Sequence, residues 1–156
     1  MNKTAADPRE RATQVVGFLR RHKNDRGAMA NVRCALSETR KCRAWPLLGE
    51  IDGIGNVTIE TVAGLYATHP EETDKGDLGS LCKALSGENN TFEGRFKRLL
   101  TCATREEVCS HLRPLVTAAK SKGHPVNYYN LIVDLLCWGD DVRVRWAQAF
   151  WGGEAA

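Results

Sequence analysis

The sequence predicts an all-α protein with eight or nine helices in two small packed helical bundles. Apolar residues recur at intervals of three and four along almost the whole chain, which is the spacing of one helix face. No segment alternates apolar and polar residues with the period of a half-buried strand. The chain has 156 residues, 42% hydrophobic and 26% charged. This length is sufficient to bury a core without a disulfide or a metal ion.

The first half contains five apolar stripes with helical spacing. Asp7 can cap the first helix, with Pro8 at its first position, because proline is preorganised for a helix start. The fourth helix ends by His69-Pro70, because proline disfavours helical geometry in the residue before it. Gly87 ends the fifth. The stripes run from Ala12 to Leu19, Met29 to Leu36 (in a helix starting at Asp25), Trp45 to Ile51, Ile59 to Tyr66, and Leu78 to Leu85.

The second half repeats this organisation. Thr104 and Glu107 form a capping box that marks a new helix start, and Asn127 caps another helix. Pro114 lies inside a helical pattern and should kink it or split it in two. The stripes run from Phe92 to Ala103, Val108 to Ala119, Tyr128 to Leu136, and Val142 to Phe150.

A turn at residues 88–90 is the best candidate for a boundary between two structural units. It predicts an N-terminal helical bundle over residues 1–88 and a C-terminal helical bundle over residues 89–156, which count as one domain if they pack tightly. No apolar stretch approaches the roughly 20 residues of a membrane span. The N-terminus carries early charges and no apolar signal-peptide core. We therefore expect a cytoplasmic protein that does not contact a membrane.

Charge is segregated along the chain, although the net charge is only +3. Residues 1–43 hold eleven Lys or Arg and four Asp or Glu, a net of +7. Residues 44–94 carry a net of −7, and residues 95–156 a net of +3. Two basic segments flanking an acidic one suggest that a basic face meets an anionic partner.

Motifs for catalysis and for metal binding are absent from the sequence. The six cysteines include no C-x-x-C pair, and no H-x3–5-H pair accompanies them. We expect reduced thiols, with Cys82, Cys109 and Cys137 beside helical apolar positions. No P-loop, dinucleotide-binding, nucleophile-elbow or zinc-protease motif occurs. The prediction is a protein without enzymatic activity, cofactor or metal.

Basic residues are the candidate functional residues. Arg26, Arg33 and Arg40 are spaced by seven, which keeps them near one helical stripe, and Lys41 and Arg43 follow. The alternative interpretation is an ordinary solvated face. Four C-terminal aromatics fit core spacing better than a base-stacking platform. These are Trp138, Trp146, Phe150 and Trp151.

Residues 120–151, KSKGHPVNYYNLIVDLLCWGDDVRVRWAQAFW, resemble the C-terminal signature of the CasB family. This family is the small subunit of the type I-E CRISPR surveillance complex, Cascade. Residues 92–116, 25–36 and 44–48 are similar to helices of the same family. The resemblance implies a two-bundle helical fold and no catalysis. It also implies a subunit that contacts the backbone of the target and displaced DNA strands and steadies the R-loop.

The resemblance also implies partners and site residues. The partners are the backbone and large subunits of Cascade, a second copy of the chain, and crRNA-guided target DNA with its displaced strand. Cys34 and Pro114 stand where relatives often carry basic residues. The positions that match the family's basic pattern are Arg26, Arg33, Arg95, Arg98, Arg113, Lys120, Lys122, Arg143 and Arg145, while Arg40, Lys41 and Arg43 are added from charge alone.

Two alternatives remain open at this stage. The first is a purely structural scaffold, whose basic faces dock on acidic protein neighbours and whose acidic segment 44–94 meets a second copy. The second is an enzyme with a dispersed site.

Overall fold

The computed structural model describes residues 7–87 and 90–152, and in these ranges it is all-helical. These ranges contain ten α-helices and three short 3₁₀ helices, and no named strand. The predicted all-α class is confirmed, and the number of α-helices is higher than the eight or nine expected. Residues 88 and 89 of the expected turn lie outside the described residues. The helices are α1 (Pro8–His22), α2 (Arg26–Arg33), η1 (Cys34–Leu36), η2 (Lys41–Ala44), α3 (Trp45–Leu48), η3 (Gly49–Ile51), α4 (Val57–Thr68), α5 (Leu78–Ser86), α6 (Glu93–Thr101), α7 (Arg105–Ser110), α8 (Leu112–Lys122), α9 (Tyr128–Leu136) and α10 (Asp140–Trp151).

Local signals place most helix starts. The side chains of Asp25, Thr104 and Asn127 each accept a hydrogen bond from the backbone N–H three residues later, at 3.0, 3.2 and 3.0 Å. Asp7 makes no such bond, and Pro8 alone marks the start of α1. The pattern around Pro114 is divided between α7 and α8, because Pro114 lies in the first turn of α8, where its missing N–H leaves no helical bond unmade.

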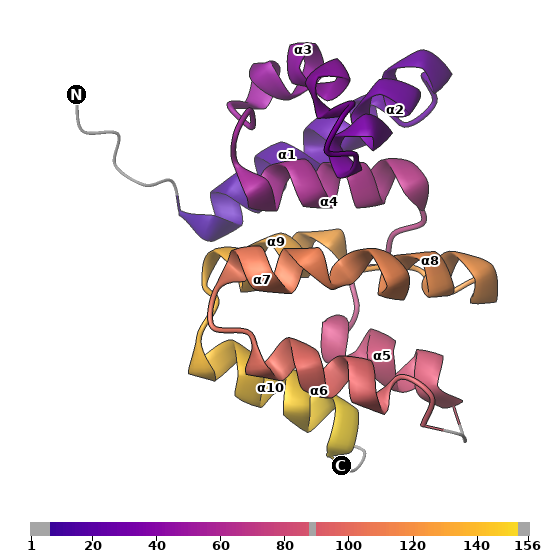
Figure 1. Cartoon of the computed structure of the whole chain (residues 1–156), viewed down its shortest axis with the longest axis vertical. Coiled ribbons are helices and arrows are strands. Elements are labelled where there is room, and N and C mark those ends of the chain that lie inside the picture. The colour runs from indigo at the N-terminus through magenta and orange to yellow at the C-terminus, as the bar shows by residue number, and fades with distance from the viewer. Residues whose placement is uncertain (1–6, 88–89, 153–156) are drawn as a thin grey trace.

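The helices form three layers in Figure 1. The elements from α1 to α4 lie at one end, α7, α8 and α9 lie in the middle, and α5, α6 and α10 lie at the other end. Helix α9 packs against α1 and α4, whereas α5 packs against α6, α8 and α10. Helices from before residue 88 therefore pack against helices from after it, both through α9 and through α5.

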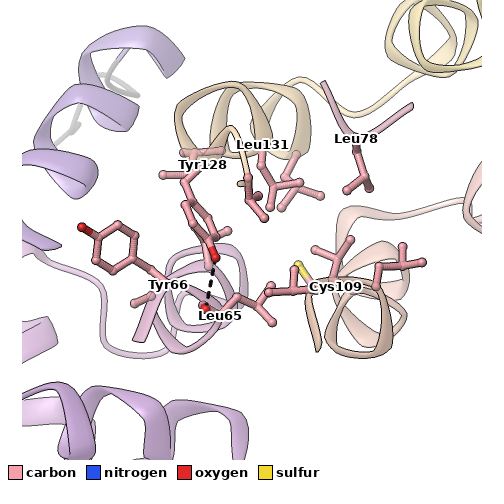
Figure 2. Packing of buried hydrophobic residues seen from close by; sticks show 14 of the residues in the cluster. Leu65, Tyr66, Leu78, Cys109, Tyr128 and Leu131 are labelled. Atoms are coloured by element: carbon pink, nitrogen blue, oxygen red, sulfur yellow. Dashed lines mark hydrogen bonds between the residues drawn. The ribbon is translucent and has the colours of Figure 1, made fainter. Parts of the chain in front are cut away.

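Tyr128 fixes α9 to α4. Its hydroxyl donates to the backbone carbonyls of Leu65 and His69, at 3.2 and 2.5 Å, and the side chain is fully buried. Figure 2 shows this hydroxyl pointing at the Leu65 carbonyl among apolar side chains. Burial raises the pKa of the Tyr128 hydroxyl, so it remains a neutral donor.

Two expectations about core residues are wrong. Cys82 and Cys109 are buried as expected, but Cys137 is exposed because it follows the last turn of α9. Trp146 is fully buried and Phe150 nearly so, whereas Trp151 is 45% exposed at the end of α10. Trp151 contacts Phe96 of α6 at a ring-centroid distance of 5.3 Å, and its indole donates to Glu93 at 3.2 Å. Helix α6 therefore covers only part of this side chain, and the rest faces solvent.

Gly79 of α5 is required where α5 crosses α10. A Cβ at this position would overlap the backbone carbonyl of Trp146 on α10, so the two helices would have to separate. Gly94, at the same position in the first turn of α6, has no neighbouring atom within 4 Å of an added Cβ.

We expect Gly79→Ala to lower the free energy of unfolding by about 1–3 kcal/mol. Gly94→Ala should leave it unchanged or raise it by up to about 1 kcal/mol. Urea unfolding measures both, and equal effects would contradict the close crossing.

Candidate nucleic-acid interface

The twelve predicted site residues fall into three groups. The α2–η2 group is Arg26, Arg33, Arg40, Lys41 and Arg43. The expected single helical stripe of Arg26, Arg33 and Arg40 is wrong, because α2 ends at Arg33 and Arg40 directly precedes η2. The α6–α8 group is Arg95, Arg98, Arg113, Lys120 and Lys122. The α10 pair is Arg143 and Arg145.

The α2–η2 group is mostly exposed and unpaired. Arg33 Nη2 donates weakly to the carbonyl of Ala67 at 3.4 Å, and Lys41 Nζ lies 3.8 Å from a Glu38 carboxylate oxygen. In the part of the chain that the structure describes, the three remaining arginines form no ion pair within the chain. Their charges are available to an anion in solution.

Two members of the α6–α8 group, Arg95 and Lys122, lie over the ring of Phe92. The Arg95 guanidinium lies 5.8 Å from the ring centroid, and Lys122 Nζ lies 5.3 Å from the same centroid. Lys122 also donates to the Leu85 carbonyl at 2.8 Å, at the end of α5. The start of α6 and the end of α8 thus present cations side by side, because both contact one aromatic ring.

Arg98, Arg113 and Lys120 complete the α6–α8 group. All three side chains are exposed, and among the described residues none forms an ion pair. Arg113 and Lys120 are seven residues apart on α8 and therefore share one stripe. Arg113 lies at the opposite end of α8 from Lys122 and lines a hollow together with Ala35 and Leu36 of η1.

The α10 pair is used by the fold. Arg143 donates to the carbonyls of Leu100 and Cys102 at 3.1 and 2.5 Å and to Asp140 Oδ1 at 2.9 Å. Its guanidinium lies 4.9 Å from the Trp138 ring centroid, and the side chain is only 25% exposed. Arg143 therefore closes the junction between α6 and α10.

Arg145 pairs with a buried carboxylate. Its Nη1 lies 2.9 Å from Asp134 Oδ1, and Trp146 Nε1 donates to Asp134 Oδ2 at 2.8 Å. Asp134 lies on α9, and its side chain is 3% exposed. Asp140 and Asp141 are nearer in sequence to Arg145, so charge spacing alone did not indicate this partner. The available signal was a lone acid in the apolar run of α9.

The ion pair between Arg20 and Glu72 joins the basic segment 1–43 to the acidic segment 44–94. Arg20 on α1 donates hydrogen bonds from Nε and Nη2 to the Glu72 carboxylate, at 3.0 and 2.9 Å. The Tyr66 hydroxyl donates to the same carboxylate at 3.3 Å. Burial, with a contribution from Glu72, raises the pKa of Tyr66 to about 12. Arg20 and Glu72 line a cleft of about 440 Å³ together with Asn127 and Tyr129. Neither Arg20 nor Glu72 is among the predicted site residues.

The described residues contain no group of three or more His, Cys, Asp or Glu arranged to hold a metal ion. Burial raises the pKa of the Cys82 thiol to about 12, which keeps it protonated. No described helix combines the length and the apolar character needed to cross a membrane.

Comparison with known proteins assigns this fold to a class, the CRISPR-associated proteins. The family model for the CRISPR-associated protein Cse2 matches residues 18–151. The chain therefore belongs to the Cse2 family, also called CasB, as the resemblance of its C-terminal residues predicted.

Solved structures share the fold. The chain is 23% identical to CasB from Thermus thermophilus, with a TM-score of 0.73 over 91% of this chain and 98% of that one. A second solved structure from Thermus thermophilus, of a CRISPR-associated protein of the Cse2 family, gives 23% identity and a TM-score of 0.74 over the same shares. CasB from M. ruber gives 22% identity and 0.67, over 90% and 92% of the two chains. No curated protein sequence is significantly similar to this chain.

Replacing an arginine that is bonded to the fold should cost more stability than replacing an exposed arginine without an ion pair. We expect Arg143→Ala to lower the free energy of unfolding by about 2 kcal/mol, because it removes charge-assisted bonds to two carbonyls. Arg98→Ala removes an exposed side chain without a partner and should change stability by less than about 0.5 kcal/mol. Thermal and urea unfolding check both variants. An Arg143→Ala variant with the wild-type free energy of unfolding would contradict the structural role of Arg143.

Asp134 should make stability depend on pH. Burial raises the pKa of its carboxyl above the ordinary 3.8, although the bonds from Trp146 and Arg145 partly offset this. Between the two pKa values, the folded chain keeps a proton that the unfolded chain has released, so the contribution of Asp134 falls as pH rises through that window. Asn does not titrate. The stability of Asp134→Asn relative to wild type should therefore rise between about pH 4 and about pH 7. Urea midpoints across this range measure it, and a constant difference would show that burial does not dominate.

Proposed function

We propose that this chain is the non-catalytic small subunit of an RNA-guided type I-E Cascade complex in antiviral defence. In this role it binds the phosphate backbone of the target and displaced DNA strands and stabilises the R-loop. The observation that carries the proposal is the set of exposed cations without partners in the α2–η2 and α6–α8 groups. Its partners are the backbone and large subunits of the complex and a second copy of itself, in the prokaryotic cytoplasm.

The physical chemistry of R-loops suits such a surface. Opening a DNA duplex and forming an RNA–DNA heteroduplex is a nearly balanced exchange, so modest backbone contacts can shift it. Phosphate contacts from Arg and Lys supply affinity with little sequence information. A subunit that serves every guide sequence needs contacts of this kind, since the guide itself provides specificity.

The structure sharpens which predicted residues suit this role. Five exposed cations form no ion pair with any residue that the structure describes: Arg26, Arg40, Arg43, Arg98 and Lys120. Arg143 and Arg145 hold the α6–α9–α10 junction together, so replacing them tests folding as much as binding. The proposed phosphate contacts therefore centre on the α2–η2 and α6–α8 groups.

A second candidate function is a scaffold that bridges protein neighbours without touching DNA. Its support is apolar surface outside the basic groups. Trp45, Ile54 and Val57 are exposed near the start of α4, and Val144 is exposed on α10. The Trp45 indole donates to Glu60 at 3.1 Å, so this apolar surface is bordered by acid. Such a surface suits a protein partner better than a phosphate.

Salt-dependent DNA binding distinguishes the two functions. The test variant carries Arg40→Glu, Arg98→Glu and Lys120→Glu, which lie on different elements and have no ion pair in the structure. We expect the slope of log affinity against log salt for single-stranded DNA to lose about 0.7 per removed contact, roughly two in total. Fluorescence anisotropy of the full chain at several salt concentrations measures this slope.

A charge-matched variant serves as the control. Lys23, Lys75 and Lys83 are exposed and lie outside both groups, and their replacement by Glu changes the net charge equally. The control should keep most of the wild-type slope. If both variants lose the same amount of salt slope, binding depends only on net charge, and the assignment of the interface to these two groups is wrong. If the wild-type chain shows no salt-dependent binding, the scaffold function is favoured.

A further inference from the structure

A hollow of about 320 Å³ lies between η1, α4, α7 and α8, and Arg113 of the α6–α8 group lines it. Leu36 of η1, Val57 and Thr61 of α4, Ser110 of α7 and Arg113 of α8 contribute to its wall. Ligand sites in proteins span about 300–1,000 Å³, so this hollow is at the small end of that range. It suits a compact ligand rather than a dinucleotide or a long peptide segment.

The wall combines apolar faces with hydrogen-bonding groups. Leu36 and Val57 offer apolar surface, and Val57 is exposed although it is a large hydrophobic residue. Thr61 carries a hydroxyl, which both donates and accepts, and Glu106 carries a carboxylate, which accepts only. The Ser110 hydroxyl already donates to the Glu107 carbonyl at 2.6 Å, so no bond to the ligand is assigned to it. A planar ligand that carries an N–H donor could satisfy this set.

The charges around the hollow cancel. Two carboxylates, Glu38 and Glu106, line it together with Arg113, and Lys41 lies 3.8 Å from Glu38. A phosphate inside would face both carboxylates, which disfavours an anion there. Arg113 and Lys41 nevertheless belong to the groups that contact phosphates in the proposed function. A strand held by these groups would therefore carry its bases past a neutral hollow.

We propose that this hollow receives one unstacked nucleobase with an exocyclic amino group, cytosine or adenine, from a bound DNA strand. The amino group donates to a carboxylate, as the amino group of cytosine does to Glu or Asp in groove recognition, and the ring lies against the apolar wall. Thymine lacks this amino group. The inference rests on the proposed function, because the phosphate contacts bring the strand to the hollow.

Oligonucleotides that differ only in their bases test the proposal. The full chain is titrated by anisotropy with single strands of about 15 nucleotides, made of deoxycytidine, of thymidine or of abasic deoxyribose units. All three carry the same phosphates. We expect the deoxycytidine strand to bind about fivefold tighter than the abasic strand, the low end for one specific base contact, with the thymidine strand in between.

Two variants at Ser110 locate the effect. Ser110→Trp fills the hollow with an aromatic side chain, whereas Ser110→Ala removes the same hydroxyl and leaves the space open. Ser110 is exposed and its hydroxyl bonds only to the Glu107 carbonyl within the described residues, so both variants should fold, which circular dichroism checks. Ser110→Trp should abolish the preference for deoxycytidine and keep the salt slope, and Ser110→Ala should keep both.

The outcomes separate this inference from the proposed function. A wild-type chain that binds all three strands equally, with a normal salt slope, overturns the base site and leaves the phosphate contacts standing. A deoxycytidine preference that survives Ser110→Trp also overturns it, because the base then binds elsewhere. Absence of salt-dependent binding to any strand overturns the proposed function and the base site together.

Discussion

The arrangement of the helices depends on one buried carboxylate. Asp134 of α9 accepts hydrogen bonds from Trp146 and Arg145 of α10, at 2.8 and 2.9 Å. At the opposite end of α9, the Tyr128 hydroxyl donates to the Leu65 carbonyl of α4. One short helix therefore connects the two outer layers of the molecule. A buried charge is costly unless it is paired, so Asp134 restricts how α10 can lie against α9.

This constraint determines which cations remain for a ligand. Arg145 neutralises Asp134, and Arg143 is committed to the carbonyls that end α6. Arg20 similarly neutralises Glu72, joining the basic first segment to the acidic middle one. Among the predicted site residues, the cations that form no ion pair within the described ranges lie in the α2–η2 and α6–α8 groups. The segregated charge of the sequence thus serves folding in part, and only its exposed remainder is available to nucleic acid.

Features that depend on neighbouring residues in the sequence were predictable. The caps at Asp25, Thr104 and Asn127, and the break near Pro114, follow from local hydrogen bonding and proline geometry. Long-range features were not. The pairing of Arg145 with Asp134 depends on the crossing of α9 and α10. Periodicity placed Cys137 and Trp151 in the core, but burial depends on how much of each side chain the neighbouring helices cover. Candidate cations could be listed from charge, while their separation into structural and free residues required the packing.

The most direct test of the central claim uses the whole assembly. The RNA-guided complex is reconstituted with and without this chain, and its affinity for target DNA is measured at two salt concentrations. We expect the chain to tighten target binding, and we expect that gain to shrink at the higher salt concentration, because phosphate contacts release counterions. Equal affinity with and without the chain, or a gain that does not change with salt, would contradict a role in binding the DNA backbone.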